Sequence, residues 1–182
     1  VTIVGRRPNL LPDADPEVAA AFTERYADRF RLHTGHAATS VEETDDGIAL
    51  TARPYEYGDD GGIQEGKVTV TGDELLVAAG RRPNTDILGV EAAGVDVDDR
   101  GFVETDEYLR TTADGVWALG DIAGEFLLKH SANHEARTAV RNILGDDLQA
   151  VDYTAMPWAV FASPEVAGVG ATEAELEDAG RE

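Results

Sequence analysis

The spacing of apolar residues changes near residue 35 and divides the chain into parts of different structure. Residues 1–4 form an apolar run that predicts a buried strand. Apolar side chains at i, i+4 spacing then predict a helix, with Asp15 as its cap and Pro16 at its first position. With a further strand at 31–34, residues 1–35 predict a parallel strand–helix–strand unit.

The next segment has the alternating pattern of strands that are exposed on one face. Short strands are predicted at 39–43, 48–53 and 67–71, and together they indicate an antiparallel meander. The stretch 54–66 is rich in Gly and Asp, and it predicts a mobile surface loop.

Buried strands that end in glycine characterise the third part of the chain. Residues 73–80 and 115–121 each predict such a strand, and a short strand is expected near 102–103. A helix is predicted over 131–144, and its Glu135 is assigned either to packing or to supporting the residues of a site from behind.

The C-terminal residues change pattern once more. Residues 158–161 predict a strand, and Thr172 with Glu175 predicts the capping box of a short helix that meets Gly180. A helix that begins so close to the last residue, and a strand that begins at the first, predict a chain cut from a longer one.

Composition excludes several classes of protein. The 182 residues include 36 Asp and Glu against 15 Lys and Arg, a formal net charge of -21, which argues against binding nucleic acid or an anionic membrane. Without cysteine there is no disulfide scaffold and no thiolate site in this chain. His33 and His36 have no third ligand nearby, so no metal site is predicted.

The acidic charge also favours a halophilic cytoplasm, where ions screen the repulsion between carboxylates. That hypothesis predicts that stability rises in molar KCl. An ordinary acidic protein is the alternative.

Two of the predicted strand ends are candidate binding positions. Ligands of open α/β sheets gather at the carboxyl ends of strands, which is where 78–84 and 111–121 lie. Gly120 lets a bulky cofactor approach the backbone, and Asp121 can accept hydrogen bonds from sugar-type hydroxyls. The alternative is an ordinary turn with a capping aspartate.

These segments, together with 161–170, resemble in order the motifs of the flavoprotein disulfide reductases with two dinucleotide-binding domains. That family of pyridine nucleotide-disulfide oxidoreductases includes glutathione reductase, dihydrolipoamide dehydrogenase, mercuric reductase and mycothione reductase. Within it, residues 127–137 are most similar to mycothione reductase. A dihydrolipoamide dehydrogenase or a mercuric reductase-like enzyme is the nearest alternative.

The resemblance implies an α/β fold made of partial FAD- and NAD(P)-binding Rossmann-like, three-layer domains, with an antiparallel β-meander and the start of an α+β dimerisation domain. Residues 1–76 would be the C-terminal part of the NAD(P)-binding domain, and 77–149 the second segment of the FAD-binding domain. Residues 150–182 would begin the dimerisation (interface) domain. A cytoplasmic homodimer is implied for the full-length protein.

The implied activity is transfer of hydride from NAD(P)H through FAD and a cysteine pair to a low-molecular-weight thiol disulfide, of the mycothione or bis-γ-glutamylcystine type. Those cysteines, the catalytic histidine and the first glycine-rich FAD loop belong to parts of the family outside this chain. No catalytic residue is therefore assigned here, and the chain alone is expected to be inactive and to bind FAD poorly. An alternative of another class is a non-catalytic nucleotide-binding module.

Resemblance also assigns the residues of an FAD site. Asp121 would bind the ribityl chain of FAD, and Gly120 would give it access. Lys129 and His130 would begin a helix whose positive N-terminus is aimed at the flavin. The alternative for this pair is that both only cap and solvate the helix.

A second group of residues is assigned to the nicotinamide cofactor. Gly80 and Arg81 belong to the junction where the chain returns from the NAD(P) domain. Arg6 and Arg7 follow the first strand, where arginine suits the 2′-phosphate of NADP and an acid suits the free hydroxyl of NAD. NADP is therefore favoured and NAD is the alternative; a solvated arginine pair with no ligand stays open.

Overall fold

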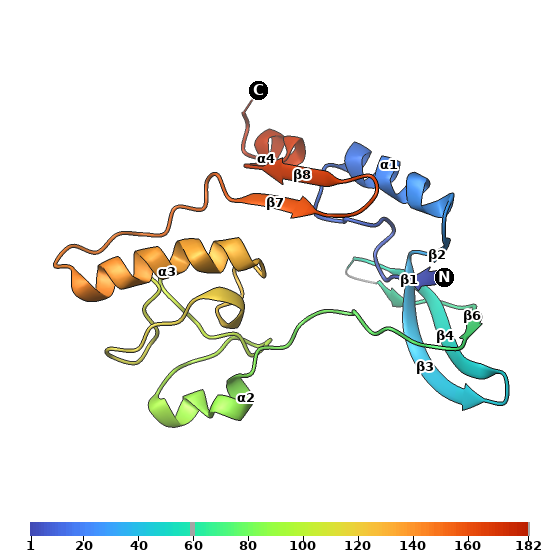
Figure 1. Cartoon of the computed structure of the whole chain (residues 1–182), viewed down its shortest axis with the longest axis horizontal. Helices are drawn as coiled ribbons and strands as arrows, with labels where there is room; N and C mark the ends of the chain where they lie inside the picture. Colours follow the sequence, from blue (N-terminus) through green and yellow to red (C-terminus); the bar gives the residue numbers. More distant parts are fainter. Residues whose placement is uncertain (59–60, 182) are drawn as a thin grey trace. The chain divides into compact units, whose positions relative to one another are not determined.

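A computed structural model describes residues 1–58 and 61–181, which form two units (Figure 1). The first unit comprises residues 1–78, 161–166 and the residues from 171 onward, and the second comprises 79–160 and 167–170. The assignment of the chain to an NAD(P) segment, an FAD segment and an interface segment stays a prediction.

The N-terminal residues form the predicted strand–helix–strand unit. β1 (Thr2–Val4) and β2 (Arg31–His33) pair in parallel, and α1 (Pro16–Ala27) connects them (Figure 1). The Phe22 side chain is buried, and its ring stacks on that of Tyr26 with the ring centroids 4.4 Å apart. The apolar stripe of the helix therefore supplies the packing that the sequence pattern predicts.

Asp15 is the N-cap residue of α1 and the helix begins at Pro16, as predicted, but the expected capping by the Asp15 side chain is wrong. The Asp15 side chain makes no capping hydrogen bond to α1. Its Oδ1 instead accepts the N–H of Glu173, 3.0 Å away, at the start of α4 (Glu173–Asp178). The first N–H groups of any helix lack partners within that helix. Here an N–H group of α4, and none of α1, donates to the Asp15 carboxylate.

The capping box predicted for α4 is confirmed. The Thr172 hydroxyl accepts the N–H of Glu175, and the Glu175 carboxylate accepts the N–H of Thr172 in return. Each of these bonds satisfies a donor that the helix itself leaves free.

The meander is also confirmed, with β4 (Gly47–Glu56) at its centre. β3 (His36–Thr44) and β6 (Val68–Gly72) each pair with it in antiparallel register (Figure 1). Ala52 is fully buried in the central strand, which is the one strand here with a partner on both sides.

The loop predicted over 54–66 is wrong in part. β4 continues through Pro54 to Glu56, and there it pairs with the short β5 (Gly62–Ile63). The strand can continue through Pro54 because not every residue of a strand donates its N–H to the neighbouring strand. Asp59 and Asp60, also part of the predicted loop, lie outside the described residues.

The strand predicted at 73–80 does not form. Leu76 and Val77 are 89% and 74% exposed, and no described segment pairs with this stretch. An apolar run becomes a strand only where a neighbouring strand can bond its N–H and C=O groups, and the described residues provide none.

The second unit packs around a small apolar core. Its buried members are Val95, Val103 and Ala118. The strands predicted near 102–103 and over 115–121 are wrong as strands, because each is reduced to one isolated bridge, Val97 to Val103 and Arg110 to Trp117. Turns on either side limit both pairings to a single position.

Short helices and one long helix complete this unit. α3 (Lys129–Leu144) confirms the predicted helix and begins two residues earlier than 131. The remaining elements are α2 (Thr85–Leu88), the 3-10 turns η1 (Val90–Ala93) and η2 (Gly120–Ile122), and the paired strands β7 (Pro157–Val160) and β8 (Val166–Val169). Among residues 1–58 and 61–181, no helix is long and apolar enough to cross a bilayer.

The loop before the 111–121 segment is organised by one carboxylate. Asp106 Oδ1 accepts the N–H groups of Tyr108 and Arg110 at 3.0 and 2.9 Å, and the Arg110 guanidinium lies 2.7 Å from Oδ2. Leu109 is thereby held at φ 70° with its side chain buried. Desolvation raises the pKa of Asp106, but the bonds from Arg110 and Tyr108 outweigh it and leave the pKa below its ordinary value.

These bonds predict that the protein loses stability in acid. An Asp106→Asn variant should lose less, because it has no carboxylate to protonate at this position. A carboxylate with a depressed folded pKa stabilises the fold above its unfolded pKa, about 3.9, and that contribution is lost as the pH falls through the folded value. We therefore expect the Tm of the wild type to fall more steeply than that of Asp106→Asn below about pH 4. Thermal unfolding over a pH series measures this, with exposed Asp114→Asn as control; parallel curves for all three proteins would contradict it.

Candidate functional site

A glycine-aspartate turn precedes the long helix of the second unit. Gly120 begins η2 with φ +73°, a conformation that favours glycine. A Cβ placed on it would lie 3.2 Å from the Cβ of Ala132 on α3. Both the backbone conformation and the close helix therefore favour a residue without a side chain at this position.

Asp121 follows in the turn with a side chain that is 53% exposed. The Arg81 guanidinium donates to Asp121 Oδ2 at 2.8 Å and to the carbonyl oxygen of Leu127 at 2.6 Å. The structure thus brings together two residues that the sequence assigns to different cofactors. A half-exposed ion pair of this kind contributes little to stability, so its partners are free to exchange it for other contacts.

Behind the turn lies Glu135, which is 1% exposed. Its Oε2 accepts the N–H of Gly120, and its Oε1 accepts the hydroxyl of Tyr153 at 3.0 Å. Burial, and then the charge of Glu135, raise the pKa of Tyr153 well above its ordinary value. Tyr153 therefore remains a hydrogen-bond donor over the physiological pH range. We call Arg81, Gly120, Asp121 and Glu135 the Asp121 cluster.

The other residues assigned to this region lie around the start of α3 and at the junction. Lys129 and His130 are the first residues of the helix, and both are exposed. The His130 ring is hydrogen-bonded through Nε2 to the carbonyl oxygen of Pro157. Gly80 is exposed, at φ +127° with open space around its α-carbon. None of these three residues forms a described hydrogen bond to Asp121.

The first unit has a separate cluster of arginines and tyrosines. Arg6 Nε donates to the Tyr57 hydroxyl at 3.0 Å, and its guanidinium carbon lies 5.3 Å from the centre of the Tyr55 ring. The guanidinium of Arg7 lies 4.6 Å from the centre of the Tyr57 ring. We call these four residues the Arg6 cluster. The tyrosine rings hold both cations at the end of β1, where planar guanidinium groups suit a phosphate.

The histidines near this cluster do not form a metal site. The rings of His33 and His36 are 5.9 Å apart, and His36 Nδ1 is bonded to the carbonyl oxygen of Thr34 at 2.7 Å. Over the described residues, no three His, Cys, Asp or Glu side chains are arranged to hold an ion.

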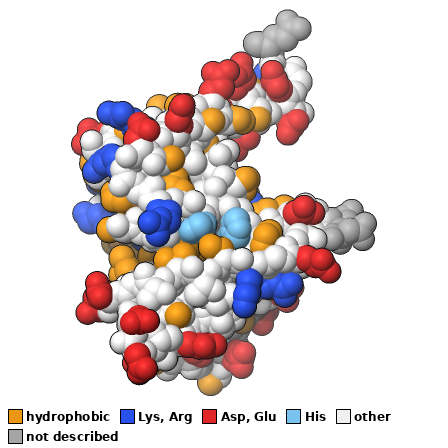
Figure 2. Space-filling view, turned by 90° about the vertical axis from the view of Figure 1, so that its right-hand side faces the viewer, with side chains coloured by type: hydrophobic (Ala, Val, Ile, Leu, Met, Phe, Trp, Pro, Cys, Tyr) orange, Lys and Arg blue, Asp and Glu red, His pale blue; other side chains and the backbone are white. Residues whose placement is uncertain are grey.

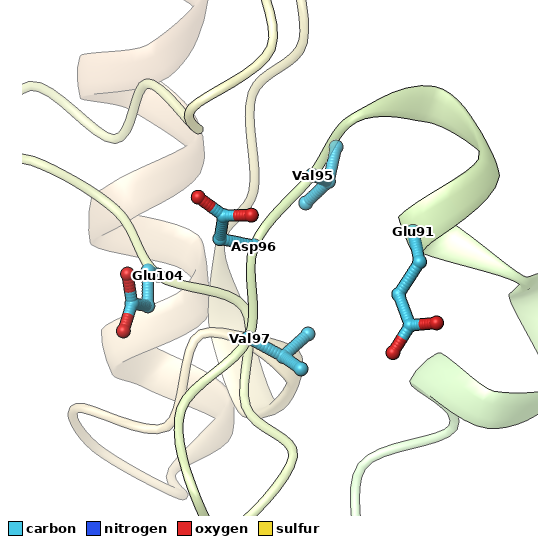
Figure 3. Close-up of a pocket in the computed structure, with 5 residues that line it drawn as sticks. All are labelled: Glu91, Val95, Asp96, Val97 and Glu104. Carbon is cyan, nitrogen blue, oxygen red and sulfur yellow. The ribbon is translucent and has the colours of Figure 1, made fainter.

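Acidic side chains are spread over the visible surface (Figure 2) and line the pocket in the second unit. Figure 2 shows Asp and Glu side chains over much of the visible face, with Lys and Arg side chains among them. A pocket of about 430 Å³ has Glu91 on one side and Asp96 and Glu104 on the other (Figure 3). Three carboxylates repel a phosphate-containing cofactor, so this pocket is not the candidate site.

Sequence reasoning missed the two tyrosines of the Arg6 cluster and Tyr153, the partner of Glu135, and it left Glu135 between packing and support of a site. Tyr55, Tyr57 and Tyr153 stand in segments whose pattern gives no sign of function. For Glu135 a signal does exist, because Ser131, Glu135 and Ala139 are spaced four residues apart and are all buried. A carboxylate on a buried stripe indicates a specific polar partner.

Comparison with known proteins defines the class of this chain. Residues 1–142 match the family model described as pyridine nucleotide-disulphide oxidoreductase, and the chain belongs to that family. Members of the family depend on FAD and use NAD(P)H to act on disulfides.

Curated relatives and solved structures agree with this assignment. Mycothione reductase from Mycobacterium tuberculosis is 42% identical over 178 residues, which are 95% of this chain and 36% of that protein. Dihydrolipoyl dehydrogenase 3 from Haloarcula marismortui is 37% identical over 182 residues, 99% of this chain and 37% of its own length. The crystal structure of LpdA from M. tuberculosis is 31% identical, with a TM-score of 0.81 over 99% of this chain and 37% of that one.

The chain spans a little over a third of the length of these relatives. It matches them along nearly all of its own residues, so the expected α/β flavoprotein reductase fold is confirmed.

Proposed function

We propose that the complete gene product containing these residues is an FAD-dependent NAD(P)H:disulfide oxidoreductase. The observation that carries this proposal is the Gly120–Asp121 turn in front of α3, in a chain of the pyridine nucleotide-disulphide oxidoreductase family. Within the proposal, the Asp121 cluster contacts FAD and the Arg6 cluster contacts the nicotinamide dinucleotide.

The residues of the Asp121 cluster fit the ribityl part of a flavin cofactor. Gly120 presents backbone without a side chain, and the Asp121 carboxylate is half exposed and able to accept hydrogen bonds from hydroxyl groups. Arg81 already donates to one carboxylate oxygen and so orients the group. When bound, FAD supplies the hydride acceptor of the reaction.

Lys129 and His130 have a less direct part in the proposal. They stand at the N-terminus of a 16-residue helix, where the aligned peptide dipoles favour negative charge. We infer that this end of α3 and Lys129 favour an anionic reduced flavin, while His130 ties the helix start to Pro157.

The Arg6 cluster supports NADPH as the reductant. Arg6 and Arg7 follow β1, and the tyrosines hold their guanidinium groups together where the 2′-phosphate of NADP would bind. NADH is the alternative cofactor. Gly80 and Arg81 stay at the junction between the segments, and Arg81 also contacts the flavin side through Asp121.

The proposed substrate is a low-molecular-weight thiol disulfide of the mycothione or bis-γ-glutamylcystine type. The 42% identity to mycothione reductase supports this choice. Dihydrolipoamide oxidation is the second candidate, favoured by the 37% identity over 99% of the chain to dihydrolipoyl dehydrogenase 3. On the family likeness we further propose a homodimer located in the cytoplasm.

The test uses the complete gene product, purified and assayed for bound flavin by its visible absorption. NADPH oxidation is then followed with mycothione, bis-γ-glutamylcystine and lipoamide, and kcat/KM is compared for the three. Bound FAD with highest kcat/KM for one of the first two supports the proposal. A protein free of flavin would refute it, and a preference for lipoamide would establish the second candidate.

A further inference from the structure

We propose that Glu135 is a positioning residue of the flavin site. Its carboxylate holds the Gly120–Asp121 turn from behind, so that the Asp121 side chain points outward to the cofactor. This inference rests on the proposed function, and it gives a specific role to a buried acid that the family match does not assign and that the sequence left between packing and support of a site.

The burial of Glu135 is the first step. The side chain is 1% exposed, and within the described residues it takes part in no ion pair. Removing a carboxylate from water is costly unless its oxygens are hydrogen-bonded. Ala139, one turn further along the same buried stripe, shows that an apolar residue can fill such a position. Packing alone therefore does not explain an acid at 135.

The contacts of Glu135 are the second step. Both carboxylate oxygens are used, Oε2 by the N–H of Gly120 and Oε1 by the Tyr153 hydroxyl. The first bond acts on the residue directly before Asp121. Glycine has more backbone freedom than any other residue, so this bond restricts the part of the turn with most freedom to change.

The second bond connects Glu135 with the residues that hold Arg81. The ring of Tyr153 packs on that of Phe126, with centroids 5.1 Å apart. Phe126 directly precedes Leu127, whose carbonyl oxygen accepts a hydrogen bond from Arg81. One buried carboxylate is thus linked both to the backbone of Asp121 and to the support of its arginine partner.

The same helix offers a matched control. Asn142 is also buried, at 4% exposure, and it also connects α3 to distant backbone. Its amide donates to the carbonyl oxygens of Tyr108 and Gln149 and accepts the N–H of Gln149. It makes no described hydrogen bond to the turn at Gly120. Loss of Asn142 should therefore reduce stability and leave the turn intact.

The experiment compares Glu135→Ala, Glu135→Gln and Asn142→Ala in the complete gene product. For each we would measure the Tm, the Kd for FAD and the visible circular dichroism of the bound flavin. Glu135→Ala should raise the Kd about tenfold, which corresponds to ~1.4 kcal/mol, and alter the dichroism. Glu135→Gln keeps an acceptor for Gly120 and should restore both. Asn142→Ala should lower the Tm alone.

The outcomes separate this inference from the proposed function. A wild-type protein without flavin overturns both. If the wild type binds FAD and Glu135→Ala binds it equally, with the same dichroism, the inference alone is overturned. The same holds if Asn142→Ala weakens FAD binding as much as Glu135→Ala does. If Glu135→Ala does not fold, Glu135→Asp replaces it, because its shorter side chain cannot reach both partners; an unchanged Kd then overturns the inference.

Discussion

Replacing Asp121 with alanine should weaken FAD binding to the complete gene product by roughly 10- to 100-fold, because a hydrogen bond to a charged group contributes about 1.5–3 kcal/mol. The variant removes the one carboxylate in the turn and leaves the conformation of Gly120 unaffected. Titration of the apoprotein with FAD, followed by flavin fluorescence, gives the Kd.

Two further variants control this measurement. Asp121→Asn keeps the size and one acceptor oxygen, and should lie between the wild type and Asp121→Ala. Asp114→Ala removes an exposed carboxylate seven residues earlier and should leave the Kd unchanged. Equal flavin affinity in Asp121→Ala and Asp114→Ala would rule out the assignment of Asp121 to the cofactor.

Removing both Arg6 and Arg7 should reduce kcat/KM for NADPH by about 100-fold while kcat/KM for NADH changes little, since charge-assisted bonds to a phosphate are about twice as strong as neutral ones. Each guanidinium is held over the ring of Tyr55 or Tyr57. The cations are therefore ordered before a ligand arrives, which lowers the entropic cost of binding. Steady-state kinetics with both cofactors measures the effect.

The matched control is Arg31→Ala, which removes an exposed cation from β2 in the same unit. It should affect both cofactors equally and weakly through the general charge of the protein. A wild-type preference for NADH would overturn the assignment of the Arg6 cluster. So would a double variant whose loss is the same with NADPH and NADH.

Local signals in the sequence were sufficient where neighbouring residues provide the partners. The α1 helix, the meander around β4 and the capping box at Thr172 each depend on contacts within a few residues or between adjacent strands. For these elements the period of the apolar residues and the capping residue types determine the structure.

The predictions that were wrong depended on distant partners. Residues 73–80 have the composition of a buried strand, but strand formation requires a neighbour that composition does not specify. Asp15 had the right position to cap α1, yet it bonds Glu173, 158 residues away. Folding brings the N–H of Glu173 to the Asp15 carboxylate, and the residues around Asp15 give no sign of this partner.

The site shows the same division. The turn at Gly120 and Asp121 was readable because its residue types are themselves the signal. The pairing of Arg81 with Asp121, across 40 residues, was not, and the roles of Tyr55 and Tyr57 depend on their side chains meeting arginines that follow another strand. Side-chain partners that are far apart in sequence leave no trace in spacing.

The close approach of Gly120 to Ala132 limits which residues can occupy position 120 during evolution, although the two positions are twelve residues apart in the sequence. A methyl group at 120 would lie 3.2 Å from the one already present at 132, and the backbone at 120 has a positive φ. A homologue that keeps this turn against its helix is therefore expected to keep glycine at position 120. Adding a side chain at 120 would require α3 to move away from the turn, and with it the start of the helix that the proposed flavin site uses.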